Sequence, residues 1–393
     1  KKYYRGSRCY LAEVPKEDAF VDYSPSGGVV STFKLSYAFA IAEAFQAHFE
    51  EIQPEIVISA DFGAESYILL IQHALGSFSD TRFILHLSGA LHEVLRVYQG
   101  QTVDMADELS EPQNRLICSM EDTCMLLADE VIAPTRQAWR EVALRLQVEE
   151  KKVHFIPNLL AQSDEGTSES GVNEINGKRY RLFIGRLDRH NGADRVLRLF
   201  IDYQARHQTD VALMMLGRDC FSKEYGRTFL EEWRERIPSD IKDKITFKGQ
   251  VQPDVVAGYL QNACVCVFPS RWEVFGIVCL EAMSYGVPSI VAADTGLAEV
   301  SGKELEDFVF DFETDSEKLV GKLHELLSAN DDLNDVSQKV ISRAHQVIDE
   351  ARAGYKNLVE GGGLPGEVDG FSDQVAEKML HALKAAGEVS YFL

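Results

Sequence analysis

Two glutamates in the second half of the chain, Glu273 and Glu281, are spaced so that both can face one elongated ligand. Seven residues separate them in the segment SRWEVFGIVCLEAMSYGVP. Residues 275–285 carry apolar side chains at helical spacing, and Gly286 and Pro288 follow as they do just beyond a helix. Glu273 then lies in a loop and Glu281 about one and a half turns into the helix. A diphosphate held between them is one interpretation, and two ordinary solvated acids are the other.

The elements around these glutamates favour an anion site. Residues 263–268 form an apolar run that predicts a buried strand ending at Pro269, and residues 287–293 predict the next strand. A strand, loop, helix and strand in this order place the N-terminus of the helix at the carboxyl edge of a parallel sheet, where unpaired N–H groups attract phosphate. Gly276 lets a ligand approach the backbone there.

The same segment resembles a known enzyme family. Its pattern, P-S-x-x-E-x-F-G-x-x-x-x-E-A-M-x-x-G-x-P, is similar to the E-x7-E signature of retaining GT-B glycosyltransferases of the glycogen synthase and family 4 type. The matching residues are Pro269, Ser270, Glu273, Phe275, Gly276, Glu281, Ala282, Met283, Gly286 and Pro288. The resemblance implies an α/β fold of two Rossmann-like, doubly wound parallel-sheet domains that face a cleft, with a nucleotide-diphosphate sugar as donor.

A second loop, GRLDRHNG from Gly185 to Gly192, resembles the G-R-L-x-x-x-K-G loop of the family. Arg186 would contact the donor diphosphate by charge-assisted hydrogen bonds. Asn191 stands where the family has a lysine, so one cation that stabilises the leaving group is missing. Either a neighbouring side chain replaces that lysine or the protein is a weak or non-catalytic relative. The candidate replacements are Arg189, His190 and Arg195.

The resemblance also assigns roles to the site residues. Glu281 would bond the donor ribose, and Glu273 the transferred sugar. The phosphates would be held by Arg186 and the backbone N–H groups of Phe275, Gly276, Ile277 and Val278, and Gly185 and Asn191 would also belong to the donor-binding loop. The catalytic group would be His86, Glu273 and Arg186. No nucleophile is required, because the departing phosphate can itself take the acceptor proton in a front-face reaction.

Three features of the first half are candidates for the site, the first as a catalytic residue and the other two on the acceptor side. His86 ends an apolar strand in ILHLSG, where the family places a histidine beside the donor sugar, although a lone histidine in such a strand is more often structural. Asp61, in ADFG, also follows a strand, and a cap is the simpler role for it. Gly27 and Gly28 form a loop of the kind that precedes a helix in such domains.

Alternating strand and helix patterns organise the whole chain. We expect an N-terminal Rossmann-like acceptor domain over residues 1–160 that lacks its usual first strand. An acidic linker over residues 161–178 joins it to the donor domain over residues 179–355. Residues 356–393 form a tail whose helix, over residues 373–386, would cross back to the first domain.

Composition and missing motifs exclude several classes. The formal net charge of −22 disfavours nucleic-acid binding. No apolar stretch predicts a transmembrane helix. The seven cysteines are dispersed without a C-x-x-C pair, which favours reduced thiols and a cytoplasmic location. No G-x-G-x-x-G follows a strand, and no histidine pair has metal-ligand spacing, so we expect neither a cofactor nor a metal.

These observations together predict a glycosyltransferase that moves a hexose with retention from a nucleotide-diphosphate sugar, with UDP or GDP as the nucleotide. The acceptor is left open among a glycan, a lipid-linked molecule, a protein and a small molecule. The alternative is a GT-B pseudo-enzyme that serves as a binding or assembly subunit. A glycan phosphorylase is the weaker third interpretation, because no lysine context for pyridoxal phosphate is evident.

Overall fold

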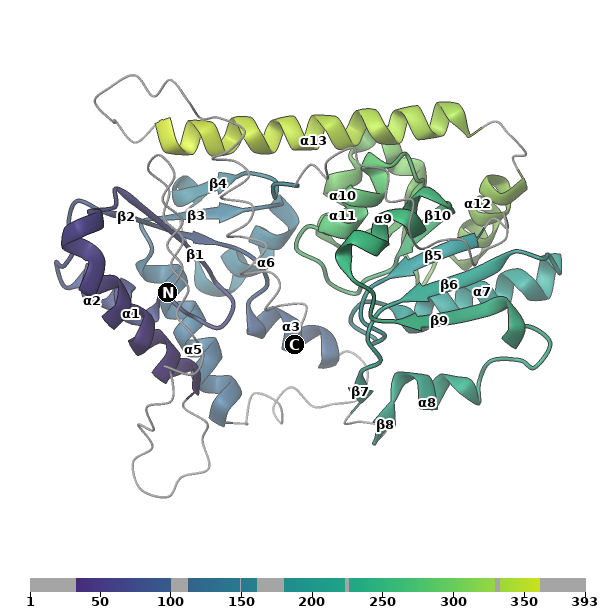
Figure 1. The fold of residues 1–393 in the computed structure, drawn as a ribbon, viewed down its shortest axis with the longest axis horizontal. Helices are drawn as coiled ribbons and strands as arrows, with labels where there is room; N and C mark the ends of the chain where they lie inside the picture. The colour runs from purple at the N-terminus through teal and green to yellow at the C-terminus, as the bar shows by residue number, and fades with distance from the viewer. Residues whose placement is uncertain are drawn as a thin grey trace. The chain divides into compact units, whose positions relative to one another are not determined.

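The computed structural model describes residues 33–99, 112–148, 150–160, 180–222, 226–328 and 333–360. The chain divides into two compact units (Figure 1). The first comprises residues 1–161 and 350–393, and the second comprises residues 162–349. The predicted loop at Gly27 and Gly28, the acidic linker and the C-terminal helix over residues 373–386 lie outside the described residues.

The first unit is built on a parallel sheet in the order β1-β2-β3-β4. Its strands are β1 (Ile56–Ala60), β2 (Arg82–His86), β3 (Glu130–Ala133) and β4 (Val153–Phe155). The helices from the N-terminal part of the chain are α1 (Phe33–Ile52), α2 (Tyr67–Ala74), α3 (Leu91–Gln99), α5 (Pro112–Leu127) and α6 (Arg136–Leu146). Each connection between parallel strands runs through helix, as a crossover requires.

The two faces of this sheet are covered by different parts of the chain. Because side chains alternate along a strand, Phe83 and Leu85 point to one face, where α1, α2, α5 and α6 build the larger core. Ile84 points to the other face, where it packs with Tyr355 and Leu358 near the end of helix α13 (Asn334–Glu360). A helix from the C-terminal part of the chain therefore completes the core of the first unit.

The second unit contains a six-stranded parallel sheet in the order β12-β11-β10-β5-β6-β9. The strands are β5 (Tyr180–Ile184), β6 (Ala212–Leu216), β9 (Ile245–Gly249), β10 (Ala263–Phe268), β11 (Ser289–Ala292) and β12 (Val309–Phe310). The chain builds outward from β5 to β9, then returns to the middle and builds from β10 to β12. This is the doubly wound order 3-2-1-4-5-6, whose direction reverses between β5 and β10.

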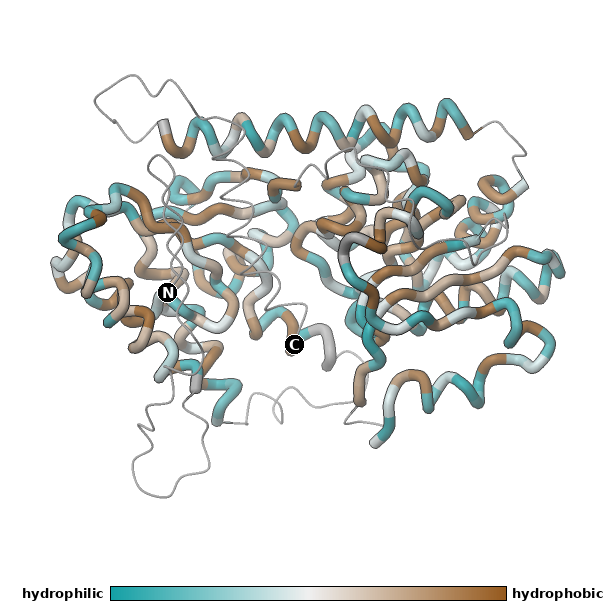
Figure 2. Tube along the Cα trace, in the orientation of Figure 1, coloured by the Kyte–Doolittle hydropathy of each residue, from teal (hydrophilic) through white to brown (hydrophobic). Residues whose placement is uncertain are grey.

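Helices cover this sheet, and hydrophobic residues run along its strands (Figure 2). The helices are α7 (Ala193–His207), α8 (Phe229–Arg234), α9 (Pro253–Gln261), α10 (Ile277–Ser284), α11 (Gly296–Ser301) and α12 (Ser316–Ser328). Helix α8 is short, because a hairpin of β7 (Phe221–Ser222) and β8 (Arg227–Thr228) precedes it and Thr228 caps it.

Helix α13 was not predicted, and the domain boundary placed at residue 355 falls inside it. Its residues up to 349 belong to the second unit and those from 350 to the first. Among the described residues, no helix is both long and apolar enough to cross a membrane.

Candidate functional site

The loops that follow β5 and β10 lie side by side at the point where the strand order reverses. Parallel strands end at the same edge of the sheet, and β5 and β10 are neighbours, so residues 185–192 and 269–276 project from one edge. In open α/β sheets the crevice at this reversal is where ligands bind. The structure thus brings together the two motifs that the sequence singled out.

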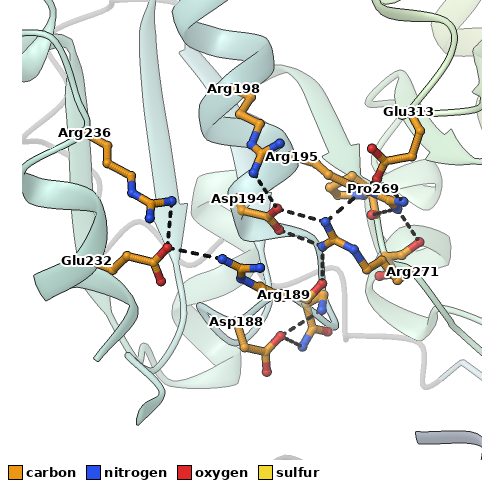
Figure 3. A network of polar contacts seen from close by, with 12 residues as sticks. Asp188, Arg189, Asp194, Arg195, Arg198, Glu232, Arg236, Pro269, Arg271 and Glu313 are labelled. Atoms are coloured by element: carbon orange, nitrogen blue, oxygen red, sulfur yellow. Dashed lines mark hydrogen bonds and ion pairs between the residues drawn. The ribbon is translucent and has the colours of Figure 1, made fainter. Parts of the chain in front are cut away.

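Close packing and hydrogen bonds join the two loops. Gly192 has a φ of 76°, and a Cβ atom there would lie 2.2 Å from the carbonyl oxygen of Pro269, so only glycine allows this approach. The two terminal nitrogens of the Arg271 guanidinium donate hydrogen bonds to the buried carboxylate of Asp194 at 2.7 and 2.9 Å (Figure 3). The Arg271 backbone N–H also donates to the carbonyl of His190 at 2.9 Å. The loop that carries Glu273 is therefore fixed relative to the loop that carries Arg186.

Glu273 is half-buried at the start of α10. Burial raises the pKa of Glu273, and the backbone N–H groups of Phe275, Val274 and Gly276 and the charge of Arg186 oppose the rise. The N–H of Phe275 donates to Glu273 Oε1 at 3.4 Å, while the Glu273 carbonyl accepts from Gly296 at 2.8 Å. The carboxylate therefore lies just before the N-terminus of α10, on the loop next to the one that carries Arg186.

Helix α10 begins at Ile277 after Gly276, whose φ of 87° is left-handed. A Cβ atom on Gly276 would lie 2.1 Å from Leu297 Cδ2. Phe275 is buried in the core, whereas Ile277, Val278 and Glu281 are half-buried. The first N–H groups of α10 have no acceptor within the helix, as at any helix start, so this end can bind an anion.

The loop after β5 is organised by Asp188, which the sequence did not single out. Asp188 Oδ2 lies 3.2 Å from Arg186 Nε. Asp188 Oδ1 accepts from both the backbone N–H and the side-chain amide of Asn191, each at 2.8 Å. Asn191, in the place of the family's lysine, is thus an amide bound to a carboxylate.

The three candidate replacements for the lysine are engaged elsewhere. Arg189 pairs with the buried Glu232 at 3.3 Å, and Arg195 pairs with Glu313 at 2.8 Å (Figure 3). Burial lowers the pKa of His190 to about 4, so this side chain is uncharged at neutral pH. In the structure, none of the three offers an uncommitted positive charge to the loop.

In the first unit, His86 ends β2 and is buried. Burial lowers the pKa of His86 to about 4, and a hydrogen bond with the Asn158 side chain opposes the shift. Asn158 follows β4 in the Pro-Asn pair. The imidazole is therefore neutral at physiological pH, so it can donate or accept a hydrogen bond but carries no positive charge.

Asp61, after β1, is fully buried and ties two loops together. Its Oδ1 accepts from Ser88 N at 2.8 Å, from Ser88 Oγ at 2.6 Å and from Gly89 N at 3.3 Å. These bonds give Oδ1 a structural role, whereas the buried Oδ2 has no hydrogen-bond partner among the described residues. Contact between Asp61 and an acceptor stays a prediction.

Glu121 on α5 is a buried acid beside Asp61 that sequence reasoning missed. Its oxygens accept from Gly63 N and Leu91 N, both at 2.7 Å. Burial raises the pKa of Glu121 to about 8, and the charge of Asp61 adds to the rise. The signal was in the sequence, because Glu121 lies four residues from both Ile117 and Met125, on the buried face of the helix.

Within the described ranges, no group of three or more His, Cys, Asp or Glu side chains is arranged to hold a metal ion. At this edge of its sheet the second unit brings together one arginine, a helix N-terminus, and the carboxylates of Glu273 and Glu281. This arrangement suits a ligand with both phosphate and hydroxyl groups.

Comparison with known proteins agrees with this chemistry. Residues 167–343 match the family described as "Glycosyl transferases group 1". An uncharacterized glycosyltransferase of Methanocaldococcus jannaschii is 27% identical over 231 residues, which cover 58% of this chain and 51% of that protein. A D-inositol 3-phosphate glycosyltransferase of Streptomyces scabiei is 23% identical over 232 residues, covering 57% of this chain and 51% of that protein. The chain thus spans about half the length of these two curated relatives.

Solved structures share the fold at lower identity. Sucrose-phosphate synthase from Thermosynechococcus elongatus superposes with a TM-score of 0.64 at 19% identity, covering 91% of this chain and 86% of that one. Anabaena HepE in complex with UDP and glucose gives a TM-score of 0.58 at 17% identity, covering 84% and 83%. The chain therefore has the GT-B fold, and its residues 167–343 match the glycosyl transferases group 1 family.

Proposed function

We propose that the protein is a retaining glycosyltransferase that moves a hexose from a nucleotide-diphosphate sugar to a hydroxyl acceptor. One observation carries the proposal. The loop of Arg186 and the loop of Glu273 project from one edge of the sheet at the reversal of strand order, beside the N-terminus of α10. An arginine and a carboxylate at one helix start suit a diphosphate and the sugar attached to it.

Each residue has a role in this proposal. Arg186 and the first N–H groups of α10 bind the diphosphate and stabilise the charge that develops on it as the sugar leaves. Glu281 bonds the ribose, and Glu273 bonds the hydroxyls of the transferred sugar. The departing phosphate takes the proton of the acceptor hydroxyl, so no side chain has to form a covalent intermediate. The neutral His86 imidazole supplies a hydrogen bond without adding charge.

A UDP-sugar is the first donor to test. HepE, which shares the fold, was solved in complex with UDP and glucose. GDP-sugars and ADP-sugars are the alternatives, because the base is bound by loop shape rather than by Arg186, Glu273 or Glu281. The acceptor class is open among glycans, lipid-linked molecules, proteins and small molecules.

The test is to incubate the protein with UDP-, GDP- and ADP-sugars and a set of hydroxyl acceptors, and to measure nucleotide release. The proposal predicts release with at least one donor, and a product with the anomeric configuration of that donor by NMR. Equal rates with and without EDTA are expected, because the proposed chemistry uses no metal. A product of inverted configuration would contradict the retaining mechanism.

A second candidate is a GT-B subunit that binds a nucleotide sugar without transferring it. The bond between Asn191 and Asp188 favours it, because an amide held by a carboxylate supplies no cation to the leaving group. Nucleotide-sugar binding without nucleotide release, across the whole acceptor set, would support this second function over the first.

A further inference from the structure

Asp188 holds two residues that the proposed donor loop needs. Its Oδ2 lies 3.2 Å from Arg186 Nε, and its Oδ1 accepts two hydrogen bonds from Asn191 at 2.8 Å. The pair is well shielded, since 11% of the Asp188 side chain and 23% of the Arg186 side chain are exposed. Both oxygens of one carboxylate are therefore engaged by the residues that would meet the diphosphate.

The backbone turn needs an oxygen at this position but not a negative charge. Asp188 Oδ1 accepts the N–H of Asn191, and the Asp188 carbonyl accepts the N–H of Ala193 at 3.1 Å, which shapes the start of α7. Aspartate, asparagine and serine all make turns of this kind with a side-chain oxygen. The charge of Asp188 is thus an addition that the turn itself does not explain.

That charge acts on the cation of the site. Arg186 is the arginine whose charge reaches Glu273, and its Nε faces Asp188 at ion-pair distance. Carboxylates and phosphates bind a guanidinium with the same geometry, so they compete for its donors. We propose that Asp188 is an internal counter-anion, which holds Arg186 in the ligand-free protein and competes with the donor diphosphate for it.

This inference rests on the proposed function and adds, at the same site, a residue that weakens donor binding. A diphosphate must draw Arg186 away from Asp188 and must also approach the negative charge of that carboxylate. Asp188 therefore weakens donor binding, and it does so independently of which sugar or base the donor carries.

The contact between Asn191 and Asp188 also predicts the effect of a lysine at position 191. The side-chain nitrogen of Asn191 lies 2.8 Å from Asp188 Oδ1. In the Asn191→Lys variant, the ammonium group can reach the same carboxylate and be neutralised by it. The two positions are therefore coupled, and Asn191→Lys alone should tighten donor binding less than it does in a protein that also carries Asp188→Asn.

The experiment is calorimetric titration of the full chain with UDP-, GDP- and ADP-sugars, for the wild type and for Asp188→Asn, Asn191→Lys and the double variant. Asp188→Asn keeps the oxygen that the turn needs and removes the charge, so donor binding should tighten at least about fivefold at low salt. Asp188→Ser, which also keeps an oxygen, is a second neutral variant in case the first does not fold.

Glu317→Gln is the matched control. Glu317 pairs with Arg206 at 2.7 and 2.9 Å on the surface of α12, so the substitution removes the same charge from an exposed ion pair. Donor affinity should be unchanged in this control. Equal tightening by Glu317→Gln would assign the effect to net charge and overturn the role of Asp188.

The remaining outcomes separate this inference from the proposed function. If the wild type binds a nucleotide sugar and both neutral variants at position 188 bind it equally well or more weakly, the internal counter-anion is refuted and the donor site stands. If neither the wild type nor any variant binds a nucleotide sugar, the donor site is refuted, and the inference with it.

Discussion

Arg271 and Asp194 form a bidentate ion pair, with nitrogen to oxygen distances of 2.7 and 2.9 Å, although 77 positions separate them in the chain. Asp194 is 1% exposed and lies in the first turn of α7, whereas Arg271 lies two residues before Glu273. The pair therefore fixes the loop of Glu273 against the helix that follows the loop of Arg186.

Breaking this pair should destabilise the second unit. Arg271→Met leaves the Asp194 carboxylate buried without its main partner, which costs about 3 kcal/mol or more in the free energy of unfolding. Arg198 provides the control, because it approaches the same carboxylate at 3.9 Å with a side chain that is 59% exposed. Arg198→Met should cost less than about 1 kcal/mol.

Urea unfolding followed by tryptophan fluorescence, to which Trp272 beside Arg271 contributes, measures both variants. A similar loss of unfolding free energy in Arg271→Met and Arg198→Met would contradict a stabilising role for the Arg271–Asp194 ion pair. In a variant that stays folded, Arg271→Lys, donor binding should also weaken, since lysine cannot make the two parallel bonds that a guanidinium makes.

Gly276 should tolerate no side chain. Its φ is 87°, and a Cβ atom would lie 2.1 Å from Cδ2 of Leu297, which is itself buried. Gly276→Ala combines left-handed strain with overpacking, so we expect a loss of about 2 to 4 kcal/mol in stability.

Gly226→Ala separates the two causes. Gly226 has a φ of 61°, and a Cβ atom there would meet no other atom within 4 Å, so only the strain of about 1 kcal/mol applies. Thermal or urea unfolding of both variants gives the comparison. If Gly276→Ala is no more destabilising than Gly226→Ala, Leu297 yields to the added methyl group and the start of α10 is loosely packed.

Stability should fall with rising pH because of Glu121. Its pKa in the folded protein is raised from 4.5 to about 8, by burial and then by the charge of Asp61. The folded state therefore binds the proton more tightly than the unfolded state. The stabilising contribution is complete below about pH 4.5 and is lost as the pH rises to about 8.

Glu121→Gln should flatten the dependence of unfolding free energy on pH between about 5 and 8, because glutamine does not titrate in this range. Glu43→Gln, which neutralises an exposed acid on α1, is the control for charge alone. Urea unfolding at several pH values measures the slope. An unchanged slope in Glu121→Gln would show that this carboxyl group is not the one that titrates.

Much of the fold could be predicted because buried parallel strands leave short apolar runs in the sequence. The runs that predicted β10 and β11 coincide with the structure to within about two residues, which is the usual disagreement at element ends. Helix α13 also carries a pattern, with Val340, Ala344, Ala351 and Tyr355 buried on one face. Most of the other residues of α13 are polar, so the apolar periodicity was not recognised in the sequence.

The site was predictable only in part, for a physical reason. Glu273, Gly276 and Glu281 lie on one continuous segment, so their spacing along the chain carries their geometry. Asp194 and Arg271 meet only after folding, and no local signal marks either as a partner. The sequence shows Asn191 as a missing cation, but only the structure shows that its amide is bound to Asp188.

The central claim is that the second unit binds a nucleotide-diphosphate sugar at the loops after β5 and β10. Its most direct test is calorimetric titration of UDP-, GDP- and ADP-sugars into the wild type, Arg186→Gln, Glu281→Gln and the surface control Arg206→Gln. The account predicts that one donor binds to the wild type and to Arg206→Gln equally, and at least about tenfold more weakly to the other two variants. Binding that is unchanged in Arg186→Gln and Glu281→Gln, or absent from every protein in the set, would contradict it.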